Sequence, residues 1–206
     1  MKLAEIKIRE YLNQLKSSSP APGGGSASAL AGAQGMGLMI MVCDLTIGRS
    51  KYAETEPLCM EVKEKGLEIF EELIQLIDKD TEAYNQVSEA FKMPKDTDAE
   101  KEVRSKAIAA ATLAATEIPY RVMELCVKGI MLTDSLVGKT NSNASSDLGV
   151  AALNLHAGVK GAWMNVKINL PGVKDLEKAE FYEKSGMEMV NATEEILHQV
   201  EAKIME

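Results

Sequence analysis

The sequence is short of cysteine, histidine and aromatic residues, and these shortages argue against several classes of site. Its 206 residues include three cysteines, two histidines and 4% aromatic residues. The cysteines, Cys43, Cys59 and Cys126, are odd in number and far apart, so we expect neither a disulfide framework nor a metal site. With so few histidines, no Ser-His or Cys-His catalytic arrangement is evident. Free thiols fit a reducing compartment, and we expect a cytoplasmic protein.

Positive charge is also scarce. The chain has 23 Lys and Arg against 31 Asp and Glu, a formal net charge of −8. A nucleic-acid phosphate backbone would repel such a chain, so we expect no nucleic-acid partner. The length and the 46% of hydrophobic residues suit one globular unit with its own core, and we expect a single domain over residues 1–206.

Charge is absent altogether from residues 17–43, a run that contains six of the chain's 15 glycines. A membrane-spanning helix needs about 20 predominantly apolar residues. The first part of the run, residues 17–25, is rich in Ser, Pro and Gly and is typical of a loop. The remainder predicts a buried helix that begins with Ser26 as its cap and continues toward Gly48. We therefore expect no membrane partner, although a membrane-associated helix stays open as an alternative.

The rest of the chain shows helical periodicity with clear start and stop signals. Leu3–Lys16 predicts an amphipathic helix with Ile8, Leu12 and Leu15 on one side. Further helices are expected over residues 55–91, from a capping box at 97–100 to residue 136 with a kink or interruption at Pro119, over 145–163, and from 176 to the end. The predicted fold is an all-α, single-domain bundle of about six helices, with a short extended segment near residues 166–170.

One carboxylate interrupts an apolar stripe on the long helix predicted over residues 55–91. Asp80 lies at helical spacing with Leu76 and Tyr84. A carboxylate on an apolar stripe is unfavourable unless it is paired, and burial raises its pKa toward neutrality, where it can exchange a proton. Asp80 is therefore the candidate catalytic residue; the alternative is a structural Asp bonded to a neighbouring Lys or Arg.

Several polar or glycine-rich segments are candidates for substrate binding. Backbone N–H groups at the start of a helix can approach an electron-rich ligand, and an Arg suits a carboxylate. Side chains that alternate along an extended segment project from one side and can hold a polar heterocycle. The candidates are Gly23, Gly24, Gly25, Ser26, Arg49, Lys51, Asn143, Asp147, Asn165, Lys167 and Asn169. The alternatives are ordinary turn, cap and surface roles.

Six segments occur together in one order and carry a resemblance. They are Pro20-Ala-Pro-Gly-Gly-Gly-Ser26, Gly48-Arg-Ser-Lys-Tyr52, Asp78-Lys-Asp-Thr-Glu-Ala-Tyr84, Met93-Pro-Lys95, Ser146-Asp-Leu-Gly-Val-Ala-Ala152 and Asn165-Val-Lys-Ile-Asn-Leu170. The chain resembles the cyclodeaminase/cyclohydrolase family of folate enzymes over nearly its whole length. That family includes the C-terminal domain of formiminotransferase-cyclodeaminase and free-standing bacterial methenyltetrahydrofolate cyclohydrolases.

The resemblance implies an all-α homodimer that acts on a reduced folate, with or without a polyglutamate tail, and needs no cofactor beyond that substrate. It implies that Asp80 transfers the proton and that Arg49 and Lys51 meet the glutamate tail. The expected reaction is hydrolysis of 5,10-methenyltetrahydrofolate to 10-formyltetrahydrofolate. Deamination of formimidoyltetrahydrofolate to the same methenyl compound is one alternative, and a non-catalytic folate-binding helical protein is another.

Overall fold

The computed structural model describes residues 2–205, which form helices and loops without a strand. The six α-helices are α1 (Ile8–Leu15), α2 (Gly24–Asp44), α3 (Glu56–Lys92), α4 (Asp98–Leu136), α5 (Ser145–Asn169) and α6 (Leu176–Met205). The described residues also form four single 3₁₀ turns: η1 (Leu3–Glu5) before α1, and η2 (Ser50–Tyr52), η3 (Ser142–Ala144) and η4 (Leu170–Gly172) between α-helices. The prediction of an all-α bundle of about six helices is confirmed.

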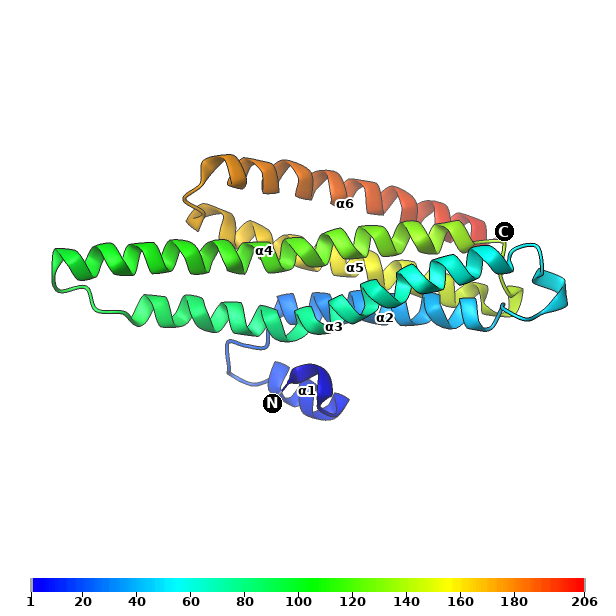
Figure 1. Ribbon diagram of the computed structural model, residues 1–206, viewed down its shortest axis with the longest axis horizontal. Helices are drawn as coiled ribbons and strands as arrows, with labels where there is room; N and C mark the ends of the chain where they lie inside the picture. Colours follow the sequence, from blue (N-terminus) through cyan, green and yellow to red (C-terminus); the bar gives the residue numbers. More distant parts are fainter. Residues whose placement is uncertain (1, 206) are drawn as a thin grey trace.

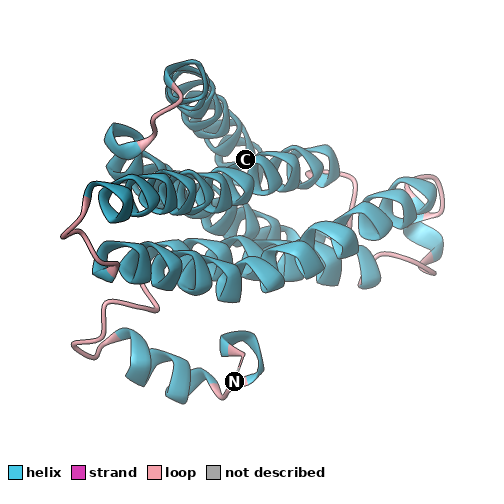
Figure 2. Ribbon diagram, turned by 60° about the vertical axis from the view of Figure 1, so that its left-hand side comes forward, coloured by secondary structure: helices cyan, strands magenta, loops and turns pink. Residues whose placement is uncertain are grey.

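The five long helices run side by side, and α2 lies among them (Figure 1). It packs against α3, α4 and α5, while α6 covers α4 and α5 on the other side. The short α1 lies outside the bundle, below α2 and α3 (Figures 1 and 2). The C-terminal end of α3 and the N-terminal end of α4 extend past the start of α2 (Figure 1).

Close packing explains why α2 carries no charge before its last residue, Asp44. A Cβ atom at Gly32 would lie 2.5 Å from the Cys126 sulfur, and one at Gly158 would lie 2.8 Å from it, so α2, α4 and α5 meet here at glycine distance. Within residues 2–205, α2 alone is long and apolar enough to cross a membrane, and 56% of its apolar stretch is buried in the bundle. Burial against neighbouring helices therefore accounts for the uncharged composition.

The N-terminal prediction is wrong in its details. The helix expected over Leu3–Lys16 is divided into η1 and α1, because Ile6 and Lys7 adopt extended backbone angles. Of the three residues on the predicted apolar side, Leu15 packs against the core, whereas Ile8 is 80% and Leu12 51% exposed. Tyr11, which was not part of that prediction, is buried.

The extended segment predicted near residues 166–170 is wrong. Residues 166–169 continue α5 as a helix, so Asn165 and Asn169 lie one turn apart on the same side. Pro119 lies inside α4, which runs from Asp98 to Leu136, so of the two predicted alternatives, a kink or an interruption, the interruption is wrong. The capping box of Thr97 and Glu100 at the start of α4 is confirmed.

Candidate functional site

A pocket of about 340 Å³ lies at the N-terminus of α2. The glycine-rich loop forms one wall through Gly23, Gly24 and Gly25, α3 contributes Asp80 and Tyr84, and α4 contributes Ala115. Asn165 and Asn169 complete it from α5. Residues separated by more than a hundred positions thus converge where α2 begins. Five of the predicted binding residues, from the glycine-rich loop and α5, line the pocket together with Asp80.

Asp80 is held by the first turn of α2. The backbone N–H of Ser26 donates a hydrogen bond to Asp80 Oδ2 at 2.9 Å, and Asp80 is partly buried. Burial raises the pKa of the Asp80 carboxyl above its usual value, and the hydrogen bonds from Ser26 offset part of that rise. Because no lysine or arginine pairs with it among the described residues, the carboxylate keeps an oxygen available to the pocket.

The close approach of Asp80 to α2 depends on a glycine. A Cβ atom at Gly25 would overlap the Asp80 carboxyl group, so no other residue fits there without moving it. At Gly24 a Cβ atom would lie 3.3 Å from the Asn165 amide nitrogen. These two glycines let the backbone reach the polar groups of α3 and α5, which is the close approach expected of such a loop.

Ser26 is not the helix cap that the sequence predicts. Helix α2 begins at Gly24, and Gly23 stands at the cap position without a side-chain hydrogen bond. The Ser26 hydroxyl instead donates to the Ile77 carbonyl at 2.6 Å and lies 3.2 Å from the Thr81 hydroxyl. Ser26 therefore fixes α2 to α3 immediately beside Asp80.

The two asparagines of α5 present oxygen atoms to the pocket. The Asn165 side-chain NH₂ donates to the Gly161 carbonyl at 2.8 Å, and that of Asn169 donates to the Ala115 carbonyl at 2.8 Å. Carbonyl groups only accept, so the NH₂ groups must point toward them and the amide oxygens must point elsewhere. Both amide oxygens are thus available to hydrogen-bond donors of a ligand in the pocket.

Pro119 fixes the orientation of Asn169. A proline has no N–H, so Pro119 leaves the carbonyl four residues earlier, that of Ala115, without its helical donor. The Asn169 amide supplies that missing donor from α5. This hydrogen bond helps α4 to continue as a helix through Pro119. Pro119, which the sequence suggested only as a kink or an interruption, thus contributes to the shape of the site.

Asp78 and Asp80, two residues apart, have different roles. Asp78 accepts a hydrogen bond from the Leu3 backbone N–H at 2.6 Å and so holds η1 against α3. Tyr11 lies on α1 and was not among the residues that the sequence suggested for the site. Its hydroxyl is buried without a hydrogen-bond partner among the described residues, and burial and the nearby Asp80 charge raise the pKa of this phenol.

Besides Ser26, which lies beside Asp80 but does not line the pocket, five of the candidate binding residues do not reach it. Lys167 lies on another side of α5 and pairs with Glu183 at 2.6 Å. Arg49 and Lys51 lie around η2, and Asn143 and Asp147 lie in η3 and the first turn of α5. Helix α2 separates these four from Asp80 by about 30 Å, given 1.5 Å per residue.

The four distant residues form a second polar cluster at the other end of α2. There the Ser142 backbone N–H donates to the Tyr52 hydroxyl at 3.0 Å, and the hydrogen bonds to Ser142 lower the pKa of Tyr52 to about 8. The Asn141 backbone N–H donates to the Thr46 hydroxyl at 3.0 Å, which ties this loop to the end of α2. One chain therefore carries two groups of predicted site residues, one at each end of the same helix.

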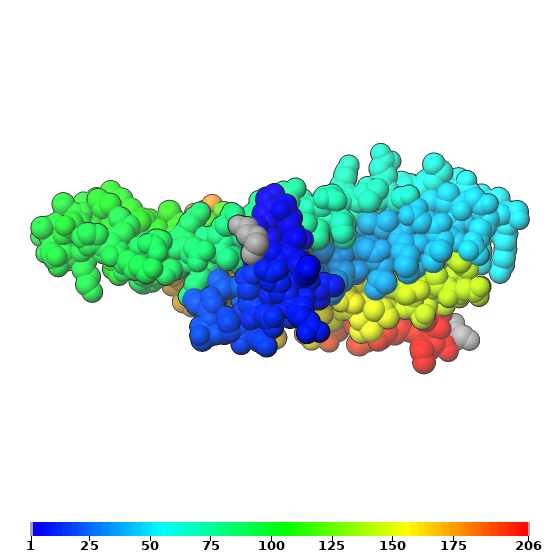
Figure 3. Space-filling model, turned by 90° about the horizontal axis from the view of Figure 1, so that it is seen from below, coloured from blue at the N-terminus to red at the C-terminus, as the bar shows by residue number. Residues whose placement is uncertain are grey.

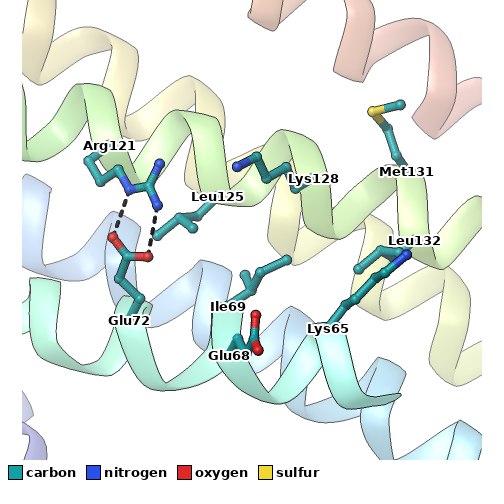
Figure 4. Close-up of a pocket in the computed structure, with 9 residues that line it drawn as sticks. All are labelled: Lys65, Glu68, Ile69, Glu72, Arg121, Leu125, Lys128, Met131 and Leu132. Atoms are coloured by element: carbon teal, nitrogen blue, oxygen red, sulfur yellow. Dashed lines mark hydrogen bonds and ion pairs between the residues drawn. The ribbon is translucent and has the colours of Figure 1, made fainter. Parts of the chain in front are cut away.

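A groove of about 400 Å³ between α3 and α4 is larger than the Asp80 pocket (Figure 4). On its wall Arg121 donates to the two carboxylate oxygens of Glu72 at 2.7 and 2.8 Å. This pair joins α3 to α4. We assign the groove a structural role.

The histidine inside the bundle is structural. His156 lies between α5 and α6, where its Nδ1 is 3.1 Å from the Thr193 hydroxyl. Burial, together with the nearby charge of Lys160, lowers its pKa, which favours the neutral ring. Within residues 2–205, no three His, Cys, Asp or Glu side chains gather as a metal site would require.

Comparison with known proteins gives results that agree with one another. A family model described as formiminotransferase-cyclodeaminase matches residues 7–188. A methenyltetrahydrofolate cyclohydrolase of Methylorubrum extorquens is 39% identical over 173 residues, which are 84% of this chain and 83% of that protein. A formimidoyltransferase-cyclodeaminase of Mus musculus is 31% identical over 183 residues, and the match spans 33% of that longer protein.

The fold is also similar to a solved structure. The crystal structure of formiminotetrahydrofolate cyclodeaminase from Thermotoga maritima superposes with a TM-score of 0.79 at 25% sequence identity. The superposition covers 97% of this chain and 94% of the other. The likeness therefore extends over the whole bundle.

Proposed function

The chain belongs to the formiminotransferase-cyclodeaminase family, and from this premise we propose that it hydrolyses 5,10-methenyltetrahydrofolate to 10-formyltetrahydrofolate. The observation that carries the proposal is Asp80, a partly buried carboxylate with a raised pKa in a pocket that also presents amide oxygens. The cyclohydrolase relative matches over most of both chains, which favours hydrolysis over deamination.

The reaction needs one group that takes a proton and gives it back. Water adds to the carbon that bridges N5 and N10, and Asp80 takes a proton from that water as the new C–O bond forms. The C–N5 bond then breaks, the proton on Asp80 goes to N5, and the formyl group stays on N10. The hydroxyl on that carbon loses its proton to solvent as the formyl C=O forms, so one proton is released overall. The substrate's bridge is a cation, so the Asp80 carboxylate also stabilises it electrostatically before water attacks.

The other polar groups of the pocket suit the pterin ring. This ring carries N–H and NH₂ donors, and the oxygens of Asn165 and Asn169 are acceptors with fixed orientation. The apolar side of the pocket, formed in part by Val87 and Ile168, suits the flat faces of the ring. These contacts orient the bridging carbon toward Asp80.

We further propose a cytoplasmic homodimer that acts on mono- and polyglutamylated substrates without a cofactor beyond the folate itself. The family resemblance supports the dimer. The three buried free thiols support a reducing compartment.

Cyclodeamination is the second candidate, and the similarity to the Thermotoga maritima cyclodeaminase favours it. In that reaction N10 attacks the formimino carbon, Asp80 receives the N10 proton and passes it to the departing ammonia. The methenyl compound is the substrate of the hydrolysis and the product of the deamination, so one pocket can serve either reaction. The test is to assay the purified protein with each substrate, following the methenyl absorbance and the release of ammonia. Hydrolysis far faster than deamination is expected, and the reverse ratio would favour the alternative.

Asp80→Asn tests the proton-transfer role directly. We expect kcat to fall by about 10²- to 10⁴-fold, the usual contribution of a general acid-base group. The folded state should not suffer, because an Asn oxygen can still accept the Ser26 N–H and the unfavourable buried charge is removed. Glu82→Gln, which changes an exposed carboxylate nearby on α3, is the matched control and should leave kcat unchanged. Wild-type turnover in Asp80→Asn would refute the role.

A further inference from the structure

Tyr11 is a buried tyrosine whose hydroxyl has no role in the packing. The side chain is 5% exposed, and the hydroxyl forms no hydrogen bond within residues 2–205. A buried hydroxyl without a partner is unfavourable, and such groups in folded proteins are usually bound to protein or to ordered water. A phenylalanine would fill the same space without this cost, so the hydroxyl requires an explanation of its own.

The N-terminal segment that carries Tyr11 is attached near Asp80 on both sides. Before α1, the Leu3 N–H donates to Asp78, which lies two residues before Asp80 on α3. After α1, the loop contributes Pro20 and Ala21 to the wall of the Asp80 pocket. Figure 3 shows this segment, in dark blue, lying over α3 and beside α2. Tyr11 is therefore held between two points that both neighbour Asp80.

Tyr11 and Asp80 also interact electrostatically. Burial raises the pKa of the Tyr11 phenol, and the charge of Asp80 raises it further. The hydroxyl forms no direct hydrogen bond with the carboxylate, and a polar pair at a longer distance is commonly bridged by one water. Tyr11 is not among the residues that line the pocket, so it acts on Asp80 without occupying the space of the substrate.

Few other ionisable groups face Asp80 from the surrounding elements. Helix α2 carries no charge before Asp44, at its far end. Among the described residues that line the pocket, Tyr84 is the other titratable group. The charged side chains of the neighbouring elements are exposed or bound to other residues: Lys7, Arg9, Glu10 and Lys16 around α1, Asp78, Lys79 and Glu82 on α3, Glu117 on α4, and Lys167 on α5.

We propose that Tyr11 is a positioning residue for Asp80, and that its hydroxyl donates through one bridging water to the carboxylate that takes the proton. A hydrogen bond to a carboxylate is stronger than one to the neutral acid, so Tyr11 favours the ionised form. When Asp80 is protonated during turnover, the hydroxyl can accept through the same water, because a phenol both donates and accepts. Tyr11 thus opposes the effect of burial and keeps Asp80 a base at lower pH. This inference rests on the proposed function, since it concerns the same catalytic residue.

Tyr11→Phe tests the role through the pH profile, because it keeps the ring and removes only the hydroxyl. The acid limb of kcat/KM follows the ionisation of Asp80 in the free enzyme. Without the hydroxyl, protonated Asp80 persists to higher pH. On that limb kcat/KM should fall about tenfold, the expected loss of one hydrogen bond to a charged group, while the plateau at higher pH changes little. An unchanged acid limb would overturn the proposal.

Tyr182→Phe is the matched control for this profile. Tyr182 is also a buried tyrosine, 8% exposed, but its hydroxyl donates to Glu117 at 3.2 Å between α6 and α4. Loss of this hydroxyl should leave the acid limb where it is. The same displacement in both variants would show a general effect of removing a buried hydroxyl and would also overturn the proposal.

Stability distinguishes a bonded hydroxyl from one without a partner. If the Tyr11 hydroxyl is bound to ionised Asp80, Tyr11→Phe should lower the urea midpoint at neutral pH, and it should change the midpoint less in an Asp80→Asn background. If the hydroxyl has no partner, its removal should raise the midpoint in both backgrounds. An equal change in the two backgrounds, of either sign, would contradict the proposed link.

Direct observation of Asp80 separates this inference from the proposed function. The Asp80 carboxyl carbon can be followed by NMR during a pH titration and identified by the loss of its signal in Asp80→Asn. We expect it to titrate at higher pH in Tyr11→Phe than in the wild type, and an unchanged titration would overturn the inference whatever the activity. Wild-type turnover in Asp80→Asn, with a displaced titration in Tyr11→Phe, would refute the proposed function and leave the link between Tyr11 and Asp80 intact.

Discussion

Replacing Pro119 with alanine should make the protein more stable and a weaker binder of its substrate. In the wild type, Pro119 leaves the Ala115 carbonyl without a helical donor, and the Asn169 amide fills that place. Alanine at position 119 restores the N–H inside α4. The new N–H competes for the same carbonyl and releases Asn169, whose oxygen then loses its fixed direction toward the pocket.

The gain in stability follows from opposing contributions. Alanine is favoured over proline inside a helix by about 3 kcal/mol. Pro119 is buried, and loss of its two additional ring carbons costs about 0.8 kcal/mol each. The free energy of unfolding should therefore rise by about 1 kcal/mol, measured by urea denaturation.

The loss in binding follows from one substrate hydrogen bond. A neutral hydrogen bond is worth about 0.5–1.5 kcal/mol, so KM should rise about two- to tenfold. Asn169→Ala in the wild type should raise KM similarly and also destabilise the protein by about 1 kcal/mol, because the Ala115 carbonyl then has no donor. In the Pro119→Ala background the same change should cost almost no stability.

This double-mutant cycle tests whether Asn169 replaces the helical donor that Pro119 lacks. If Asn169→Ala destabilises both backgrounds equally, Asn169 does not replace the donor that Pro119 lacks. If Pro119→Ala leaves KM unchanged, the orientation of Asn169 does not matter to the substrate. Steady-state kinetics at several substrate concentrations separate KM from kcat in each variant.

Two further predictions concern the packing around the site. Gly25→Ala should displace Asp80 and reduce kcat at least tenfold. The control is Gly37→Ala, where the nearest atom of Phe70 is 3.8 Å from an added Cβ; it should preserve kcat and stabilise α2 by about 0.5–1 kcal/mol. Equal kcat in both variants would contradict the Gly25 argument. All three thiols are buried, and burial raises the pKa of each, so an aromatic disulfide reagent should label none of them in the native protein and all of them after unfolding. Rapid labelling of the native protein would show that the bundle opens.

The periodicity of the sequence was sufficient for the helical class, the long helices and the choice of Asp80. Apolar spacing along α3 marks Asp80 as the unusual carboxylate, and the capping box at Thr97 marks the start of α4. These signals are local, since they depend on residues within one or two helical turns. The resemblance to a family added the chemistry, which no periodicity contains.

Local signals failed where a distant residue changed the outcome. Alternating polar residues at 165–169 suggested an extended segment, but packing against α4 keeps them in a helix and pairs Asn169 with Ala115. The single helix expected over Leu3–Lys16 was wrong because the chain breaks at Ile6 and Lys7, and Asp78 fixes the preceding turn from 75 positions away. Periodicity alone does not register such contacts.

The sequence by itself determined that the chain is a helical bundle with a glycine-rich helix start and one carboxylate on an apolar stripe, because both composition and spacing are properties of neighbouring residues. Only the tertiary structure decided that these features meet in one pocket and that Arg49 and Lys51 lie at the far end of α2. The reason is the length of that helix. Residues predicted to share a site can do so only if the fold, or a second chain, brings the two ends of α2 together.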